Sequence, residues 1–395
     1  AVYEGLPKLI LLKDEAEKIA VSYAKQTFGF DFSMVFYDVT TLYYESCRED
    51  ADIFDEEGNM IEKGLRKGGL GKEIKIGQPI IVIGLMVTKE GFPISYEVYE
   101  GNTFEGDTFI PSILGFKKKY NIQTFTIVAD AAMISFDNVE KLKEQQLSYI
   151  VGARIANLKQ TEMAHIHTEL IGDNQTAEEL QKIDGKSIRT QTKNGLLICD
   201  FSLKRYKKDK REMEKQIIRA ENLVAKNTEG KRTKFLMLKQ TEKITDKKKK
   251  KGKDKKEKAY ELNTDLIEKT KRLLGTKGYY TNLFEKDETL TDADIITHYH
   301  NLWHVEKAFR IAKSDLAARP IFHHKRDSIE AHILIVFSSL CLAKAIEMKT
   351  NYSIRSVNDM IWDILDITFT DKLTGKQFVK RMDVEDNPMV KLLEN

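Results

Sequence analysis

The chain has 395 residues, of which 41% are hydrophobic and 32% are charged, and its formal net charge is +3. That length allows two or three domains with sizeable cores. No uninterrupted apolar run approaches the roughly 18 residues that a membrane span needs. We therefore expect a charge-rich globular protein that has no membrane as a partner.

The cysteines and the first residues bear on the cellular compartment. Cys47, Cys199 and Cys341 are far apart and lack CxxC spacing, which indicates reduced, packed thiols. The first residues have neither the basic start nor the apolar core of a signal peptide. Both patterns predict a cytoplasmic protein.

The small net charge hides an uneven distribution. Between Lys204 and Lys258 basic residues outnumber acidic ones by more than two to one, so the rest of the chain is net acidic. One segment is therefore suited to a polyanion. The run at Lys247–Lys258 fits a solvated, disordered linker and a contact to nucleic acid equally well.

Periodicity divides the first part of the chain into alternating strands and helices. The expected elements are a helix at 13–26, a strand at 33–44, paired strands at 80–88 and 93–99, a helix at 109–120, a strand at 124–129, a helix at 138–146 and a strand at 147–151. Gly91 in the turn of the hairpin can take a positive φ. This order predicts an α/β fold with a sheet of mixed strand direction.

The second part of the chain is less regular until residue 292. Strand-like stretches at 187–203 and 234–239 flank a basic helix at 207–226, and we interpret residues 157–289 as an insertion domain. Helical periodicity then returns. The expected helices are one at 292–313, an apolar one at 326–349, and one or two short ones in the tail at 353–395.

Two carboxylates occupy unusual places in the expected sheet. Asp38 lies in the middle of an apolar, β-branched strand, where a charged group must be paired or bound to metal. Asp130 follows the apolar strand 124–129 at its carboxyl end, where α/β folds commonly bind ligands. Both residues are therefore candidates for a functional site.

A third acid, Glu306, lies on the helix expected at 292–313. It shares one helical face with Tyr299, Trp303, Arg310 and Lys313. Interleaved charges and aromatic residues on a core-facing stripe suggest a site at the rim of the sheet. An ordinary helix ion pair between Glu306 and Arg310 explains the same spacing and is the commoner pattern. The position of Trp303 on this face fits packing in the protein core as well as contact with a bound substrate.

Carboxylates from two strands and one helix would make a hard, all-oxygen metal site. Such a site suits Mg²⁺ or Mn²⁺ and not zinc. Two of these ions can clamp the attacking and leaving oxygens of a phosphodiester. His298, His300 and His304 do not share one helical face, and HExxH is absent. The Gly-rich stretch 67–72 matches neither common nucleotide-binding motif.

These residues carry a resemblance to the DDE transposases of bacterial and archaeal insertion sequences, in the group with a YREK signature. Tyr299, Glu306 and Lys313 match three of the four positions of Y-x2-R-x3-E-x6-K, and Leu302 replaces the Arg. Nearby Arg310 is a candidate substitute for it. Supporting similarities surround Asp38, Asp130 with Asn138, the hairpin at Gly84 to Gly101, Arg319-Pro, and His332.

The resemblance implies a ribonuclease-H-like mixed sheet flanked by helices. It divides the chain into a helical remnant at 1–32, a catalytic core at 33–156 and 290–350, a largely β insertion at 157–289, and a helical tail at 351–395. It implies Asp38, Asp130 and Glu306 as the catalytic, metal-holding triad for two Mg²⁺ or Mn²⁺ ions. One ion would lie between Asp38 and Asp130, and the other between Asp38 and Glu306.

The remaining motif residues are expected to contact DNA. Tyr299 and Lys313 carry over as phosphate contacts, Arg310 and Arg319 add positive charge, and Trp303 could stack on an unpaired base. The implied activity is metal-dependent hydrolysis at transposon ends followed by strand transfer into target DNA, by a homodimer on paired ends in a prokaryotic, nucleoid-associated setting. Two alternatives stay open: a metal-dependent nuclease without strand transfer, and a relic that only binds DNA.

Overall fold

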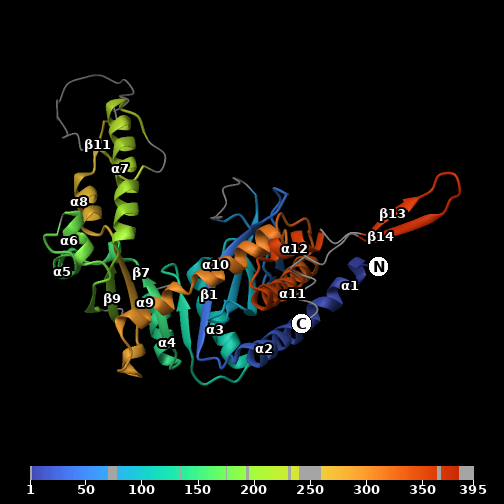
Figure 1. The fold of residues 1–395 in the computed structure, drawn as a ribbon. Helices are drawn as coiled ribbons and strands as arrows, with labels where there is room; N and C mark the ends of the chain where they lie inside the picture. The colour runs from blue at the N-terminus through green and yellow to red at the C-terminus, as the bar shows by residue number, and fades with distance from the viewer. Residues whose placement is uncertain are drawn as a thin grey trace. The chain divides into compact units, whose positions relative to one another are not determined.

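The computed structural model describes residues 2–69, 78–133, 135–174, 176–192, 195–229, 233–239, 259–362 and 366–381. The chain divides into two compact units, one of Ala1–Val151 with Thr297–Asn395 and one of Gly152–Ile296 (Figure 1). The run Lys247–Lys258 and part of the Gly-rich stretch 67–72 lie outside the described residues. The first unit takes in both the N-terminal helices and the tail, which the sequence analysis set apart as separate segments.

The first unit is built on five strands. They are β1 (Met34–Tyr43), β4 (Ile80–Val87), β5 (Pro93–Glu100), β6 (Thr126–Ala129) and β7 (Ser148–Ala153). Their order is β5-β4-β1-β6-β7. β4 is antiparallel to β1 and β5, and β1, β6 and β7 are parallel. β4, the second of these strands along the chain, thus runs antiparallel to the other four, as in ribonuclease-H-like sheets, and the predicted mixed sheet is confirmed. A separate small hairpin joins β2 (Ile53–Phe54) to β3 (Met60–Glu62).

Helices cover both faces of this sheet because its strands are apolar on both sides (Figure 1). On one face, α3 (Glu105–Lys119) packs on β4 and β5 and against α4 (Phe136–Glu144). α2 (Lys13–Phe28) and α11 (Arg326–Thr350) pack against β5, and α10 (Trp303–Arg310) packs on β1 and β4. The remaining helical segments of this unit are α1 (Val2–Leu9), η1 (Ile10–Leu12), η4 (Ile311–Asp315) and α12 (Ile354–Trp362), and α9 (Asp292–His300) leads into it.

By length and composition, α11 is the one helix in the described chain that could cross a membrane. The sequence predicts it as an apolar helix at 326–349 whose apolar stretch is too short to span a membrane. In the structure 44% of its most apolar window is buried inside the protein. Phe337 and Leu340 pack among the apolar side chains beneath it, and the ring of Phe337 contacts that of Tyr96 on β5. One face of α11 therefore packs on the sheet at β5, while Ile335, Leu342 and Ile346 of the same helix are exposed.

The second unit is mixed, and the predicted largely β insertion is wrong in this respect. Its strands β8 (Ser187–Thr192), β9 (Gly195–Phe201) and β12 (Thr276–Thr281) are antiparallel neighbours in the order β12-β9-β8, and β10 (Leu236–Leu238) pairs with β11 (Tyr260–Leu262). Its helical segments are η2 (Ile155–Asn157), α5 (Gln160–Leu170), α6 (Ala177–Lys182), α7 (Leu203–Ala225), α8 (Thr264–Arg272) and η3 (Leu283–Glu285). Met213, Ala220, Phe235, Ile267 and Leu274 form its own apolar cluster, and α7 contributes Met213 and Ala220 to it.

The tail departs from the predicted helices in its second half. After α12 the chain forms a hairpin of β13 (Asp366–Thr370) and β14 (Gln377–Arg381). Polar and apolar residues alternate along β13, a period-two pattern that favours a strand over a helix. Residues 382–395 lie outside the described part of the chain.

Candidate active site

Asp38 is presented by the central strand β1. Its neighbour Tyr37 points to the opposite face, where its hydroxyl donates to Thr108 Oγ1 at 2.8 Å and lies 3.2 Å from Ser112 Oγ. Burial raises the pKa of the Tyr37 hydroxyl far above its usual range, so it stays a neutral donor. A side chain at Gly84 would collide with this tyrosine, because a Cβ there would lie 2.5 Å from its hydroxyl. These contacts hold β1 in place. Asp38, which is half-buried, therefore lies on the face of the sheet that α10 covers.

Asp130 lies at the carboxyl end of β6 and is exposed. The loop that follows it is held by Asn138, whose Nδ2 donates to the carbonyls of Gly106 at 2.9 Å and Met133 at 2.8 Å. Ser135 caps α4 by accepting from the Asn138 N–H. Asn138, which the sequence grouped with the second acid, therefore fixes the backbone around Asp130.

The predicted continuous helix from 292 to 313 is instead divided into three pieces. α9 ends at His300, α10 begins at Trp303, and η4 is a π-helix that includes Lys313. The apolar stripe of α10, Val305, Ala308 and Phe309, is buried and leaves Glu306 exposed. π-helical turns are rare in proteins, but those that occur are often found at functional sites. The π-helix that includes Lys313 is therefore consistent with a functional site next to α10.

One cavity of about 410 Å³ brings the three predicted acids together. Its lining comprises Asp38, Val39, Thr40, Asp130, Leu302, Glu306, Phe309, Arg310, Lys313, Ser314 and Arg319. Strand β1, the end of β6, α10 and η4 all contribute to it. Three acids and three cations thus face a single opening on the first unit, an arrangement suited to a charged substrate.

The position of Arg319 depends on the loop between η4 and α11. The N–H of Ile321 donates to the carbonyl of Tyr43 at 2.9 Å, which docks this loop beside the end of β1. His332 Nε2 lies 3.1 Å from the carbonyl of Ala318. The guanidinium of Arg319 lies 5.8 Å from the centre of the Tyr43 ring. The loop thereby places a cation at the rim of the cavity.

Tyr299, which the sequence predicts as a contact to DNA phosphate, is not exposed in the structure. It is only 4% exposed, and its hydroxyl donates to Asp130 Oδ1 at 3.0 Å. Leu302, which occupies the place of the motif's Arg, is buried and lines the cavity. Arg310 lines the cavity one turn beyond Glu306.

The sequence leaves two alternatives open, one for the pair Glu306 and Arg310 and one for Trp303. Among the described residues Glu306 and Arg310 form no ion pair with each other, so the helix ion pair does not explain their spacing. Trp303 is 49% exposed, which does not match core packing. Its ring stacks on His304, with centroids 3.9 Å apart, and it does not line the cavity.

The donor set of the cavity suits a hard cation. The described lining residues offer carboxylates and the hydroxyls of Thr40 and Ser314, and they include neither cysteine nor histidine. Within the described residues, however, no three His, Cys, Asp or Glu side chains stand close enough together to hold a metal as they are. The types of residue therefore fit a Mg²⁺ or Mn²⁺ site. Their carboxylates would have to move closer together to coordinate the ion.

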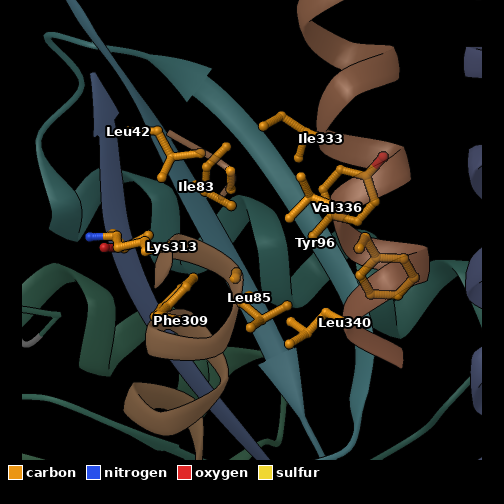
Figure 2. A pocket seen from close by; sticks show the side chains of 13 residues that line it. Leu42, Ile83, Leu85, Tyr96, Phe309, Lys313, Ile333, Val336 and Leu340 are labelled. Carbon is orange, nitrogen blue, oxygen red and sulfur yellow. The ribbon is translucent and has the colours of Figure 1, made fainter. Parts of the chain in front are cut away.

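A smaller apolar cavity of about 40 Å³ adjoins the site (Figure 2). Thr40, Phe309 and Lys313 line both cavities. Figure 2 shows Leu85 of β4 and Leu340 of α11 on its walls. This cavity therefore leaves unfilled space between the sheet and the helical segments α10 and η4.

Thr40, Ser314 and Phe309 also line the cavity, although the sequence did not mark them as site residues. Thr40 was within reach of pattern reasoning, because it lies two residues after Asp38 and so on the same face of β1. Ser314 was not, because its direction depends on the π-helical turn of η4. A π-turn inserts a residue into the helical repeat, and periodicity alone does not reveal it.

Comparisons with known proteins identify a family and a similar solved structure. The family model described as "Transposase DDE domain" matches residues 80–342, a range that includes Asp130 and Glu306 and begins after Asp38. A solved structure of piggyBac transposase, in a synaptic complex with hairpin DNA, is similar with a TM-score of 0.41 and 8% identity over 82% of this chain. The chain spans about half of that protein, 51% of its length. A search of curated proteins finds no match.

Proposed function

Because the transposase DDE domain covers most of its length, the chain belongs to that family, and we propose that it cuts and rejoins DNA as a transposase. The observation that supports this most is the cavity that holds Asp38, Asp130 and Glu306 beside three basic side chains. Mixed charge of this kind fits a phosphodiester backbone, which needs cations for its phosphates and carboxylates for metal-assisted chemistry.

The proposed reaction has two steps. Water attacks a phosphorus at the end of the mobile element, the P–O3′ bond breaks, and a 3′-OH is released. That hydroxyl oxygen then attacks a phosphorus of target DNA and displaces the target's own 3′ oxygen. Asp38, Asp130 and Glu306 would hold two Mg²⁺ or Mn²⁺ ions, which when bound supply Lewis-acid stabilisation of the attacking and leaving oxygens.

Other residues of the cavity would orient the acids and the substrate. Tyr299 donates to Asp130 Oδ1 at 3.0 Å and so restrains the rotation of that carboxylate. Arg310, Lys313 and Arg319 line the same opening and would neutralise phosphates on either side of the cut. Because each neutralised phosphate releases counterions, DNA binding should weaken steeply as salt is added.

The finer assignment is to the YREK-signature group of insertion-sequence transposases. It is supported by the spacing of Tyr299, Glu306 and Lys313, and Leu302 departs from the signature. By analogy with that group we propose double-stranded transposon ends and target DNA as partners. The same analogy gives a homodimer on paired ends and a cytoplasmic, nucleoid-associated location in a prokaryote.

Substituting one acid tests the proposal. Asp130→Asn keeps the size of the side chain but removes its charge, so Mg²⁺-dependent cleavage of a plasmid or labelled duplex should fall by at least about a hundredfold. Asp137→Asn, an exposed acid in the first turn of α4, is the matched control and should cut normally. Unchanged cleavage by Asp130→Asn would remove Asp130 from the site.

A second assay separates transposition from the two simpler activities. Pre-cut ends with a free 3′-OH are mixed with target DNA, and joined products are counted. A transposase joins them, a nuclease only cuts, and a relic does neither while still binding DNA. Absence of joining together with normal cleavage would reduce the proposal to a nuclease.

A further inference from the structure

The orientation of Glu306 depends on a short, interrupted helix. α10 has eight residues, follows a break after His300 and runs directly into the π-helical η4. The rotation of α10 therefore depends strongly on the contacts that its own side chains make. A turn of α10 about its axis would swing Glu306 along the cavity wall, because each residue occupies about 100° of the helix circumference.

A largely buried cluster of charged side chains connects α10 to α11. Lys307, the residue after Glu306, donates to Glu347 Oε2 of α11 at 2.9 Å. Lys344 lies 3.4 Å from the same carboxylate oxygen. Glu347 and Lys344 are 7% and 3% exposed, whereas a third of the Lys307 side chain reaches the surface.

The second oxygen of Glu347 is also used. Its Oε1 accepts the N–H of Ile354 at 3.1 Å, at the start of α12. Burial alone would raise the pKa of Glu347, but hydrogen bonds from Lys307 and Ile354 and the charges of both lysines bring it below its usual range. The carboxylate is thus charged and held from three directions, and breaking a buried pair of this kind is costly.

A second contact acts on the same helix. A Cβ at Gly91, in the β4–β5 turn, would lie 2.9 Å from His304 Cβ, so α10 packs closely on the hairpin there. His304 precedes Lys307 by three residues, and the two side chains therefore leave the helix on neighbouring rows. The close packing sets the distance of α10 from the sheet, while the ion pair resists its rotation.

We infer that Glu347 and Lys307 are positioning residues, which hold the rotation of α10 so that Glu306 faces the cavity with Asp38 and Asp130. The inference rests on the proposed function for what Glu306 does there. Neither residue lines the cavity, so both act through the helix and not on the DNA.

The test uses the lysine, because its loss leaves the Lys344–Glu347 pair balanced in the interior. Lys307→Met keeps an unbranched side chain and removes the charge. Lys307→Arg restores the charge and should rescue function. Lys349→Met, an exposed lysine in the last turn of α11, is the matched control. Each full-length protein is measured for melting temperature, hydrogen exchange at α10, and cleavage against Mg²⁺ concentration.

In Lys307→Met we expect α10 amides to exchange about tenfold faster, and the half-saturating Mg²⁺ concentration for cleavage to rise about tenfold, while Lys307→Arg and Lys349→Met stay near wild type. A loss of activity that only follows a lower melting temperature, with unchanged Mg²⁺ dependence, would overturn the inference, as would unchanged exchange at α10. A wild-type chain that does not cut would instead reject the proposed function, and the exchange result would still decide whether the ion pair holds α10.

Discussion

Replacing Tyr299 by Phe isolates one contact in the site. The change removes only the hydroxyl that donates to Asp130 Oδ1 at 3.0 Å. Because the ring is 4% exposed and remains in place, the packing beneath α9 and α10 should be kept. The variant therefore asks whether restraint of the Asp130 carboxylate contributes to catalysis.

The expected size of the effect follows from the setting of the two groups. A hydrogen bond to a charged group contributes about 1.5–3 kcal/mol. Asp130 is exposed, so water can replace the lost donor, and the lower end of that range applies. About 1.5 kcal/mol corresponds to a roughly tenfold lower rate of cleavage. Unfolding free energy should fall by no more than about 1.5 kcal/mol.

The assay is nicking of supercoiled plasmid under single-turnover conditions with saturating Mg²⁺. Tyr352→Phe, which alters a tyrosine that is 38% exposed and outside the cavity, is the control. A cleavage rate for Tyr299→Phe that stays within about twofold of wild type would refute the idea that this hydroxyl orients Asp130.

Three further predictions concern stability. Phe235→Ala should lower the unfolding free energy of the second unit by about 3–5 kcal/mol in urea titrations, because the ring is fully buried in its apolar cluster; a loss below about 1 kcal/mol would contradict that. Gly91→Ala should cost more than about 1 kcal/mol, since φ is +83° and a Cβ would press on His304; an unchanged melting temperature would show that the turn adapts. The pKa of Glu347 lies below its ordinary value of 4.5, so its contribution to stability is present above that pH and is lost as the pH falls through the lowered pKa. Glu347→Gln should therefore melt below wild type at neutral pH, with a gap that narrows under acid; a constant gap would exclude this linkage.

Much of the core was predictable because its strands and helices follow simple periodicity. β1, β4 and β5 are apolar or alternate with period two, and Gly91 marks the turn with a positive φ. Asp38 and Asp130 stood out because each breaks an apolar strand pattern at a place where ligands bind. Their convergence with Glu306 in one cavity depends on how β1, β6 and α10 meet, which no local pattern encodes.

The errors have local physical reasons. The break after His300 and the π-turn at Lys313 lie inside an unbroken three-to-four-residue pattern, so periodicity predicted one helix. The hairpin β13–β14 was missed, although Gly375 at φ +67° and alternation along β13 could have indicated it. In the insertion, α6 begins with the capping box of Thr176 and Glu179, a signal that was present and not used.

The most direct test of the proposed site is a crystal structure of the full chain with Mn²⁺, located by its anomalous scattering. The proposal predicts a Mn²⁺ peak in the cavity within ligand distance of Asp38 and of Asp130 or Glu306, and its loss in Asp130→Asn. An empty cavity under conditions in which the protein still cleaves DNA, or a peak bound only elsewhere, would contradict the metal-holding role of the three acids.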